Sequence, residues 1–247
     1  MNVAWKKYLL IAANSLLAVY LVLAVSAFNT PDNGSQTCRK VLINIDNGVV
    51  RGFLDAAAVK NQLQRAKIYP EGDAMDAVSV RRIEDTLENN PLIENAECYK
   101  TMGGGVVINI TQRLPVLRVM SDNGENYYID AKGDLLPSNQ YASDLAVATG
   151  HIDRKYARRV LAGIGSLILS DNFWRSQTEQ LNVRDDGSLE LVPRVGSHIV
   201  CLGQPVDVKR KLERLRKFYR YGLSQAGWNK YSVINVEFEN QIICKRR

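Results

Sequence analysis

Residues 90–115 read NPLIENAECYKTMGGGVVINITQRLP, and this stretch decides the fold of the first half of the chain. The residue before a proline is disfavoured in a helix, so Asn89-Asn90-Pro91 ends the helical pattern that precedes it. Two strand-like runs, 93–99 and 106–111, flank the turn at Gly103-Gly104-Gly105. Runs rich in β-branched residues on either side of a glycine turn are typical of a β-hairpin. We therefore expect a helix followed directly by two antiparallel strands.

The residues before this stretch supply one strand and two helices. Residues 41–45 (VLINI) form a short apolar run that predicts a strand. Residues 53–66 have apolar side chains at helical spacing, with Asp55 near the start, and Ser79 is the expected N-cap of the second helix. The predicted order is therefore β-α-α-β-β. Apolar periodicity places these residues in its core: Ile83, Leu87, Ile93, Ile108 and Ile110.

Beyond Pro115 the pattern changes to short strands joined by turns. Two Gly-containing turns, at 122–125 and 185–188, carry strong hairpin signals. Apolar residues at helical spacing predict helices over 153–169 and 206–221. Strands are predicted at 116–120, 126–129, 181–184, 189–192, 197–202, 232–238 and 241–245. The sequence thus predicts a mainly antiparallel β domain that carries two helices, and an α+β protein as a whole.

The N-terminal segment Tyr8–Phe28 holds 21 residues without a charge. As a helix it would be roughly 31 Å long, which is enough to cross a bilayer core. Lys6-Lys7 precede it and no basic residue follows before Arg39, so the positive-inside rule predicts a cytoplasmic N-terminus and an extracytoplasmic C-terminus. The alternative is a signal peptide cleaved after Val25-Ser26-Ala27. The apolar run exceeds the roughly 7–15 residues of a signal h-region, which favours the uncleaved anchor.

Composition and motifs give little support for catalysis. The 247 residues are 46% apolar and 23% charged with a net charge of +6, which excludes a disordered chain and a dedicated nucleic-acid binder. No HExxH, GxSxG, Walker or CxxC motif is present. Gly163-Ile164-Gly165 falls within a helical pattern, Asp130 suits a turn cap, and His151 and His198 suit surface or structural roles. We therefore expect no enzymatic activity, cofactor, metal or small-molecule substrate.

The cysteines and the second helix each leave two interpretations open. Cys38, Cys98, Cys201 and Cys244 allow three full disulfide pairings, and Cys201–Cys244 is the first expectation because both lie on predicted strands of the second domain. Buried free thiols are the alternative. The helix at 206–221 is rich in Lys and Arg, which suits either an anionic partner or membrane surface, or simply a solvated helix face. The solvated face is favoured.

Several motifs, in their order along the chain, resemble the FtsQ/DivIB family of bacterial cell-division proteins. The resemblance also includes the basic tail, the single anchor and the β-α-α-β-β unit, which is similar to a POTRA domain. The motifs are NPLIENA at 90–96, INI at 108–110 followed by QRLP at 112–115, YYID at 127–130 with Gly133, Leu202-Gly203 and Gly227-Trp228. Four cysteines, the triple-glycine hairpin and a very short tail depart from the family pattern.

The resemblance implies a non-enzymatic membrane scaffold of the division septum. Its expected parts are a cytoplasmic tail (1–7), a transmembrane helix (8–28), a linker (29–37), a POTRA-like domain (38–114) and a β domain (115–247). It would lie in the inner membrane with both domains in the periplasm. Its implied partners are the bitopic proteins FtsB (DivIC) and FtsL and other septal membrane proteins. The alternatives are a POTRA-bearing component of secretion or outer-membrane assembly and a secreted or anchored enzyme.

The last predicted strand is the expected partner-binding site. A sheet that ends at the C-terminus offers an unpaired edge, and such edges recruit strands. Lys245 is followed only by Arg246 and Arg247, whose charges would discourage promiscuous pairing and favour an acidic partner. By resemblance, the docking region for FtsB comprises Phe238, Gln241, Ile242, Ile243, Cys244 and Lys245. The alternative is a solvated edge with protective charge.

Overall fold

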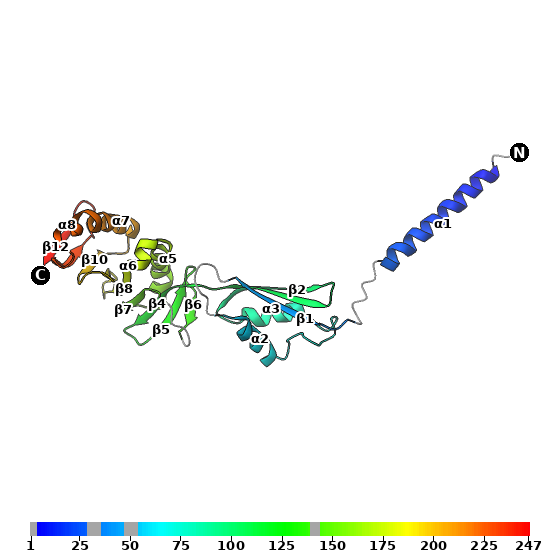
Figure 1. Cartoon of the computed structure of the whole chain (residues 1–247), viewed down its shortest axis with the longest axis horizontal. Coiled ribbons are helices and arrows are strands. Elements are labelled where there is room, and N and C mark those ends of the chain that lie inside the picture. The colour runs from blue at the N-terminus through cyan, green and yellow to red at the C-terminus, as the bar shows by residue number, and fades with distance from the viewer. Residues whose placement is uncertain (1–3, 29–35, 47–53, 139–143) are drawn as a thin grey trace.

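A computed structural model describes the chain except for residues 1–3, 29–35, 47–53 and 139–143. Three parts follow one another along the molecule: the helix α1 (Ala4–Phe28), a small domain with a three-stranded sheet, and a larger domain with a nine-stranded sheet. Figure 1 shows α1 at one end and the C-terminus at the other. The two folded domains therefore lie in series rather than packed into one body.

The helix predicted at the N-terminus is present as α1, which has 25 residues. The large apolar side chains described along it are exposed, among them Leu16, which is 75% exposed. Over the part of the chain that the structure describes, no helix is long and apolar enough to span a membrane. Membrane crossing and the signal-peptide alternative thus stay predictions. Most of the predicted linker lies outside the described residues.

The first domain has the predicted β-α-α-β-β order. Its elements are β1 (Lys40–Asp46), α2 (Ala56–Arg65), α3 (Val80–Glu88), β2 (Ile93–Thr101) and β3 (Gly105–Gln112). The sheet order is β1-β3-β2, with β1 parallel and β2 antiparallel to β3. Domain contacts begin earlier than predicted, because the carbonyl of Gln36 accepts from the Met75 amide and Thr37 bridges to Ala74.

Local signals set the helix starts and the core of this domain. Asp55 accepts a hydrogen bond from the Ala58 amide at 2.6 Å, and Ser79 accepts one from Arg82, so both are N-caps. The two helices cover one face of the sheet (Figure 1). All five predicted core residues are at most 2% exposed: Ile83, Leu87, Ile93, Ile108 and Ile110. Helical and strand periodicities therefore predicted this core correctly.

The second domain is a nine-stranded sheet in the order β12-β11-β10-β9-β8-β7-β4-β5-β6. The strands are β4 (Pro115–Ser121), β5 (Asn126–Asp130), β6 (Leu135–Pro137), β7 (Val147–Gly150), β8 (Thr178–Val183), β9 (Leu189–Pro193), β10 (Ile199–Gly203), β11 (Tyr231–Asn235) and β12 (Ile243–Arg246). Antiparallel pairs predominate, but β4–β7, β7–β8 and β10–β11 are parallel. Helical crossovers join β7 to β8 and β10 to β11, and such connections produce parallel pairs. Strand β7 was not predicted.

Both predicted helices of this domain are present. The helical segments are α4 (Arg154–Tyr156), η1 (Ala157–Leu161), α5 (Ala162–Ser170), α6 (Asn172–Gln177), α7 (Val208–Phe218), η2 (Tyr219–Leu223) and α8 (Ser224–Ala226). Gly165 explains why α5 can approach the sheet. A Cβ atom at this position would lie 2.6 Å from Cγ of Leu117 on β4. Gly165 is thus required by packing, whereas a Cβ atom at Gly163 would meet nothing within 4 Å.

Polar and apolar contacts join the two domains. Leu92, which follows α3, is buried together with Tyr128 of β5 and Leu136 of β6. Arg113 forms ion pairs with Asp130 and Asp134, and Lys132 pairs with Glu94. Asp130 also accepts hydrogen bonds from the Lys132 and Asp134 amides, as expected for a turn cap. These contacts hold β5, β6 and the turn between them against the first domain.

Candidate functional site: the C-terminal sheet edge

Strand β12 is the last strand of the nine-stranded sheet and therefore lies at its edge. It pairs antiparallel with β11, with Ile234 opposite Cys244 and Asn235 opposite Ile243. Both strands are shorter than predicted: β11 ends at Asn235, and β12 begins at Ile243. The side chain of Asn235 accepts a hydrogen bond from the Glu237 amide, which turns the chain out of the ladder. The edge location is confirmed.

The predicted docking residues divide into an outer and an inner set. Phe238 and Ile243 are 46% and 49% exposed, and Gln241 and Lys245 are also exposed. Ile242 and Cys244 instead pack against the core of the domain. Side chains alternate between the two faces of a strand, so Ile243 and Lys245 point to one side of β12 and Cys244 to the other. Phe238, Gln241 and Ile242 lie in the connection between the strands rather than in a strand.

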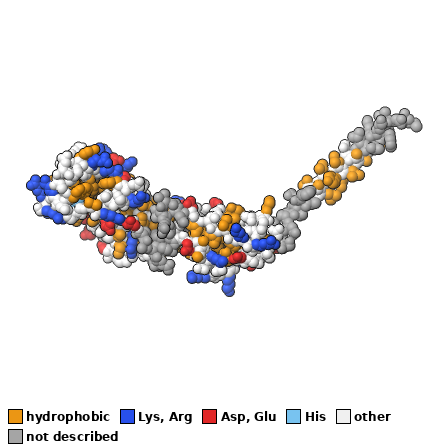
Figure 2. All heavy atoms as spheres, viewed as in Figure 1, with side chains coloured by type: hydrophobic (Ala, Val, Ile, Leu, Met, Phe, Trp, Pro, Cys, Tyr) orange, Lys and Arg blue, Asp and Glu red, His pale blue; other side chains and the backbone are white. Residues whose placement is uncertain are grey.

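Positive charge gathers at this end of the molecule. Figure 2 shows Lys and Arg side chains around the tip that carries the C-terminus, where Lys230, Lys245 and Arg246 are exposed. Arg247 has a second role, because its guanidinium donates to the carbonyl of Ser197 at 2.8 Å and to the hydroxyl of the same residue. The end of β12 is thereby fastened to the loop before β10.

The expected Cys201–Cys244 disulfide is not formed. All four cysteines are free thiols in the structure. Cys201 lies on β10 and Cys244 on β12, and β11 lies between these strands. Two strand spacings amount to roughly 9–10 Å, which exceeds the Cα separation of about 7 Å that a disulfide tolerates. Burial raises the pKa of both thiols, so they are protonated at neutral pH.

Only some of the basic side chains of α7 are exposed to solvent, and the others make contacts within the domain. Lys211 is 8% exposed and its ammonium donates to the carbonyl of Gln204 at 2.8 Å; burial lowers the pKa of this lysine. Arg216 donates to Asp171, and this hydrogen bond lowers the pKa of the carboxyl. Arg214 reaches the connection between β11 and β12. These three basic residues therefore hold loops in place, whereas Lys209 and Arg210 are exposed as predicted.

Comparison with known protein families agrees with this architecture. A POTRA-like domain model matches residues 36–111. A model described as FtsQ/DivIB, C-terminal related, matches residues 114–245, which is more than half of the chain and includes most of β12. The chain belongs to the FtsQ/DivIB-related family.

One curated relative supports this assignment to the FtsQ/DivIB-related family over most of the chain. It is the cell division protein FtsQ of Salinibacter ruber, which is 25% identical over 225 residues and covers 83% of each chain. Both domains of an FtsQ-type protein are thus present in the order that the sequence motifs predict. The family match includes the connection and strand that we treat as the candidate site.

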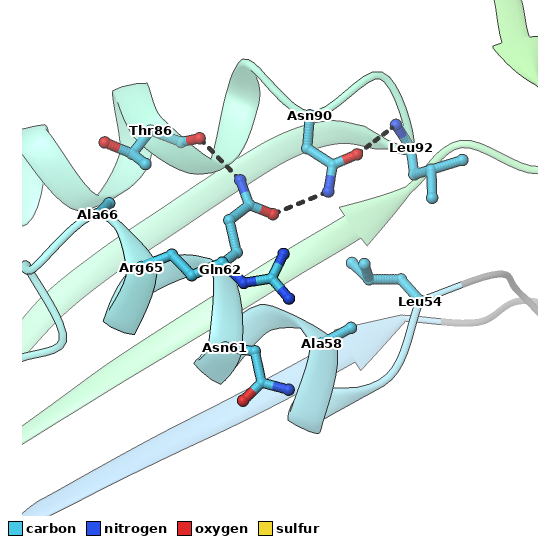
Figure 3. Close-up of a pocket in the computed structure, with 9 residues that line it drawn as sticks. All are labelled: Leu54, Ala58, Asn61, Gln62, Arg65, Ala66, Thr86, Asn90 and Leu92. Carbon is cyan, nitrogen blue, oxygen red and sulfur yellow. Dashed lines mark hydrogen bonds between the residues drawn. The ribbon is translucent and has the colours of Figure 1, made fainter.

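A groove lies away from this edge, between α2 and α3 of the POTRA-like domain. It has a volume of about 690 Å³ and is lined by Leu54, Ala58, Asn61, Gln62, Arg65, Ala66, Thr86, Asn90 and Leu92. Figure 3 shows Gln62 and Asn90 pointing toward one another across it. Gln62 donates to the Thr86 carbonyl, Asn90 donates to Gln62, and the Leu92 amide donates to Asn90. These amides hold the end of α3 against α2 and continue to the domain junction.

The two histidines occupy the positions expected of structural and surface residues. His198 is 2% exposed, and its Nε2 lies 2.8 Å from the hydroxyl of Tyr219. Burial lowers the pKa of His198. His151 is exposed, with Nδ1 3.2 Å from a carboxylate oxygen of Asp122. The predictions of no enzymatic activity and no cofactor in this FtsQ/DivIB-related protein are not tested by these contacts and stay predictions.

Proposed function

We propose that this protein is a membrane-anchored scaffold of the bacterial division machinery that docks partner proteins on β12. The membership in the FtsQ/DivIB-related family supports a role in cell division. The observation that carries the docking proposal is that the sheet ends at β12, where Ile243 and Phe238 are half exposed. The family match over residues 114–245 supports division rather than secretion or outer-membrane assembly.

Main-chain pairing supplies the basic attraction at this edge. A partner strand laid along β12 would gain hydrogen bonds that each contribute about 0.5–1.5 kcal/mol net. Phe238 and Ile243 would add apolar burial beside that ladder. Lys245 and Arg246 would favour an acidic partner strand and disfavour a basic one. Affinity thus comes from backbone and apolar contact, and selectivity comes from charge.

The proposed partners are bitopic division proteins of the FtsB/DivIC and FtsL type, together with other septal membrane proteins. The uncharged run of α1 behind Lys6-Lys7 supports a single-pass protein of the inner membrane. In that arrangement both domains lie in the periplasm. The POTRA-like domain then acts as a spacer that carries the docking edge away from the membrane.

Deleting residues 241–247 tests the docking proposal. The full chain is co-expressed with the FtsB/DivIC-type and FtsL-type proteins of the same genome and is then purified in detergent. We expect the deletion to abolish co-purification while the thermal unfolding of the POTRA-like domain is unchanged. A matched control replaces exposed basic residues elsewhere, with Lys209→Ser and Lys217→Ser. Full retention of both partners by a folded deletion variant would overturn the proposal.

Two further measurements address the membrane and septum parts of the proposal. A periplasmic reporter fused after Arg247 is expected to be active, and intact-mass analysis is expected to retain residues 1–28. A new N-terminus near Phe28 would instead show a cleaved signal peptide. A fluorescent fusion in dividing cells is expected to form a band at mid-cell, and a uniform envelope signal would contradict the septal role.

A further inference from the structure

We propose that Arg214 of α7 is the positioning residue of the docking segment, and this inference rests on the proposed function of β12. The two terminal nitrogens of Arg214 donate to two carbonyl oxygens of the connection between β11 and β12. Nη1 lies 2.7 Å from the oxygen of Glu239, and Nη2 donates to the oxygen of Val236. Phe238 lies between these two acceptors in the chain, so Arg214 holds the backbone on both sides of the exposed aromatic residue.

The connection is anchored in the core only at its ends. Val236 is fully buried, and its amide donates to the Cys201 carbonyl at 3.0 Å. Ile242 packs against the core at the other end. The five residues from Glu237 to Gln241 are all exposed. The bond from Arg214 to Glu239 therefore holds the middle of an otherwise exposed segment.

The arginine is suited to this role by its shape and surroundings. A guanidinium is planar and presents two terminal amino groups, which can bind two carbonyls at fixed angles. Hydrogen bonds from a charged donor are stronger than neutral ones. Arg214 is half-buried, and its Nε is buried without a hydrogen-bond partner among the described residues. The two terminal amino groups thus bind the connection, whereas Nε does not.

Holding the connection lowers the cost of docking. A partner that covers Phe238 must find the segment in one conformation, and an ordered segment loses less conformational entropy on binding. Without Arg214, the chain from 237 to 241 would be held at its two ends alone. We therefore expect Arg214 to affect the affinity for the partner without contacting it.

Three variants of the full chain separate this role from general stability. Arg214→Met removes the two bonds, and Arg214→Lys keeps the charge but not the planar fork. Lys217→Met is the matched control, because Lys217 lies on the same helix and is exposed, whereas Arg210 lines a hollow together with Arg214, Glu237 and Glu239. The readout without any partner is cleavage by a glutamate-specific protease after Glu237 and Glu239, compared with cleavage after Glu190 in β9.

We expect Arg214→Met to raise cleavage after Glu237 and Glu239 by about tenfold, as loss of a charged hydrogen bond predicts. Arg214→Lys should give an intermediate rate, and Lys217→Met should match the wild type. Cleavage after Glu190 should not change. Unchanged cleavage in Arg214→Met, or equal acceleration after Glu190, would overturn the inference.

Partner binding distinguishes failure of this inference from failure of the proposed function. In co-purification with the FtsB/DivIC-type protein, Arg214→Met should weaken binding by about tenfold, and Arg214→Lys should recover part of it. If deletion of 241–247 abolishes binding while Arg214→Met retains it fully, the docking edge stands and the positioning role is wrong. If the deletion also retains binding, the docking proposal and this inference both fail.

Discussion

Strands β2 and β12 are both the last strands of their sheets, yet their edges differ. Helix α3 closes the edge of β2. Oε1 of Glu84 accepts from the Cys98 amide at 2.7 Å, and Oε1 of Glu88 accepts from the Ala96 amide at 3.3 Å. Lys100 of β2 also donates to the Met75 carbonyl. Glu84 and Glu88 therefore occupy main-chain donors of β2 that a foreign strand would need for pairing.

The edge at β12 carries different side chains. Ile243 is half exposed and Lys245 is exposed, so this edge presents apolar surface and positive charge. The comparison indicates that the access of a partner strand to an edge depends on the side chains that neighbouring elements place along that edge. In this protein the β2 edge of the POTRA-like sheet is closed by α3, whereas the C-terminal sheet ends at β12 in an accessible strand.

Truncating Leu87, on the buried face of α3, should have the largest effect on the stability of the domain with the closed edge. Leu87 is fully buried under this helix. We expect Leu87→Ala to lower the free energy of unfolding by about 2–5 kcal/mol through lost burial and a cavity. Chemical denaturation of the full chain in detergent measures this change. Arg81→Ala, at an exposed position of the same helix, should change it by less than about 0.5 kcal/mol. Equal effects of the two substitutions would contradict the assigned helix face.

Removing one carboxylate should open the β2 edge. Glu84→Ala leaves the Cys98 amide without its acceptor, which should cost about 1–3 kcal/mol. Hydrogen exchange at the Cys98 amide should become faster, and the protein should show more self-association on size exclusion. Asp85→Ala is the control, because this neighbouring carboxylate is exposed. Unchanged exchange at Cys98 would show that Glu84 does not close this edge.

Truncating Phe238 should have a smaller effect, confined to the open edge. The side chain is already 46% exposed, so Phe238→Ala should leave the free energy of unfolding within about 1 kcal/mol of the wild type. Partner binding should weaken by about 1–2 kcal/mol, measured by titration with the FtsB/DivIC-type protein. Tyr99→Ala removes an aromatic side chain of similar exposure from β2. Weakening by Tyr99→Ala alone would move the docking site to the first domain.

Thiol reactivity gives the smallest expected difference between the two edges. Burial, with a further contribution from Glu84, raises the pKa of Cys98 on β2 to about 12. Cys244 on β12 is half-buried, and its pKa is raised by burial. Because the thiolate is the reactive form, iodoacetamide should modify Cys244 before Cys98 as the pH rises above 8. Peptide mass spectrometry measures the order, and earlier modification of Cys98 would contradict the closed edge.

Much of the first domain could be predicted because its signals are local. Asp55 and Ser79 cap helices through amides three residues away, and the glycine turn at 103–105 joins neighbouring strands. The periodicity that buries Ile83 and Leu87 also acts within one helix. Short loops then bring these elements together in chain order, so the β-α-α-β-β fold could be inferred without knowledge of distant contacts.

The location of the candidate site was predicted from the sequence, but its contacts and its strand neighbours were not. The sequence alone indicated an edge near the C-terminus and the residues 238 and 241–245. It did not indicate that Phe238 lies in a turn, that β11 separates Cys201 from Cys244, or that Arg247 bonds to Ser197. These features depend on which strands become neighbours, and helical crossovers decide that order.

The sequence by itself determined the two domains, the helical caps, the core of the POTRA-like domain and the family to which the protein belongs. Only the tertiary structure decided which sheet edge is closed, which is open, and which basic residues of α7 act as internal clamps. Arg214 meets acceptors 22 and 25 residues further along the chain, and Glu84 meets an amide 14 residues away. Such contacts have no local periodicity, because they form only after whole elements have packed.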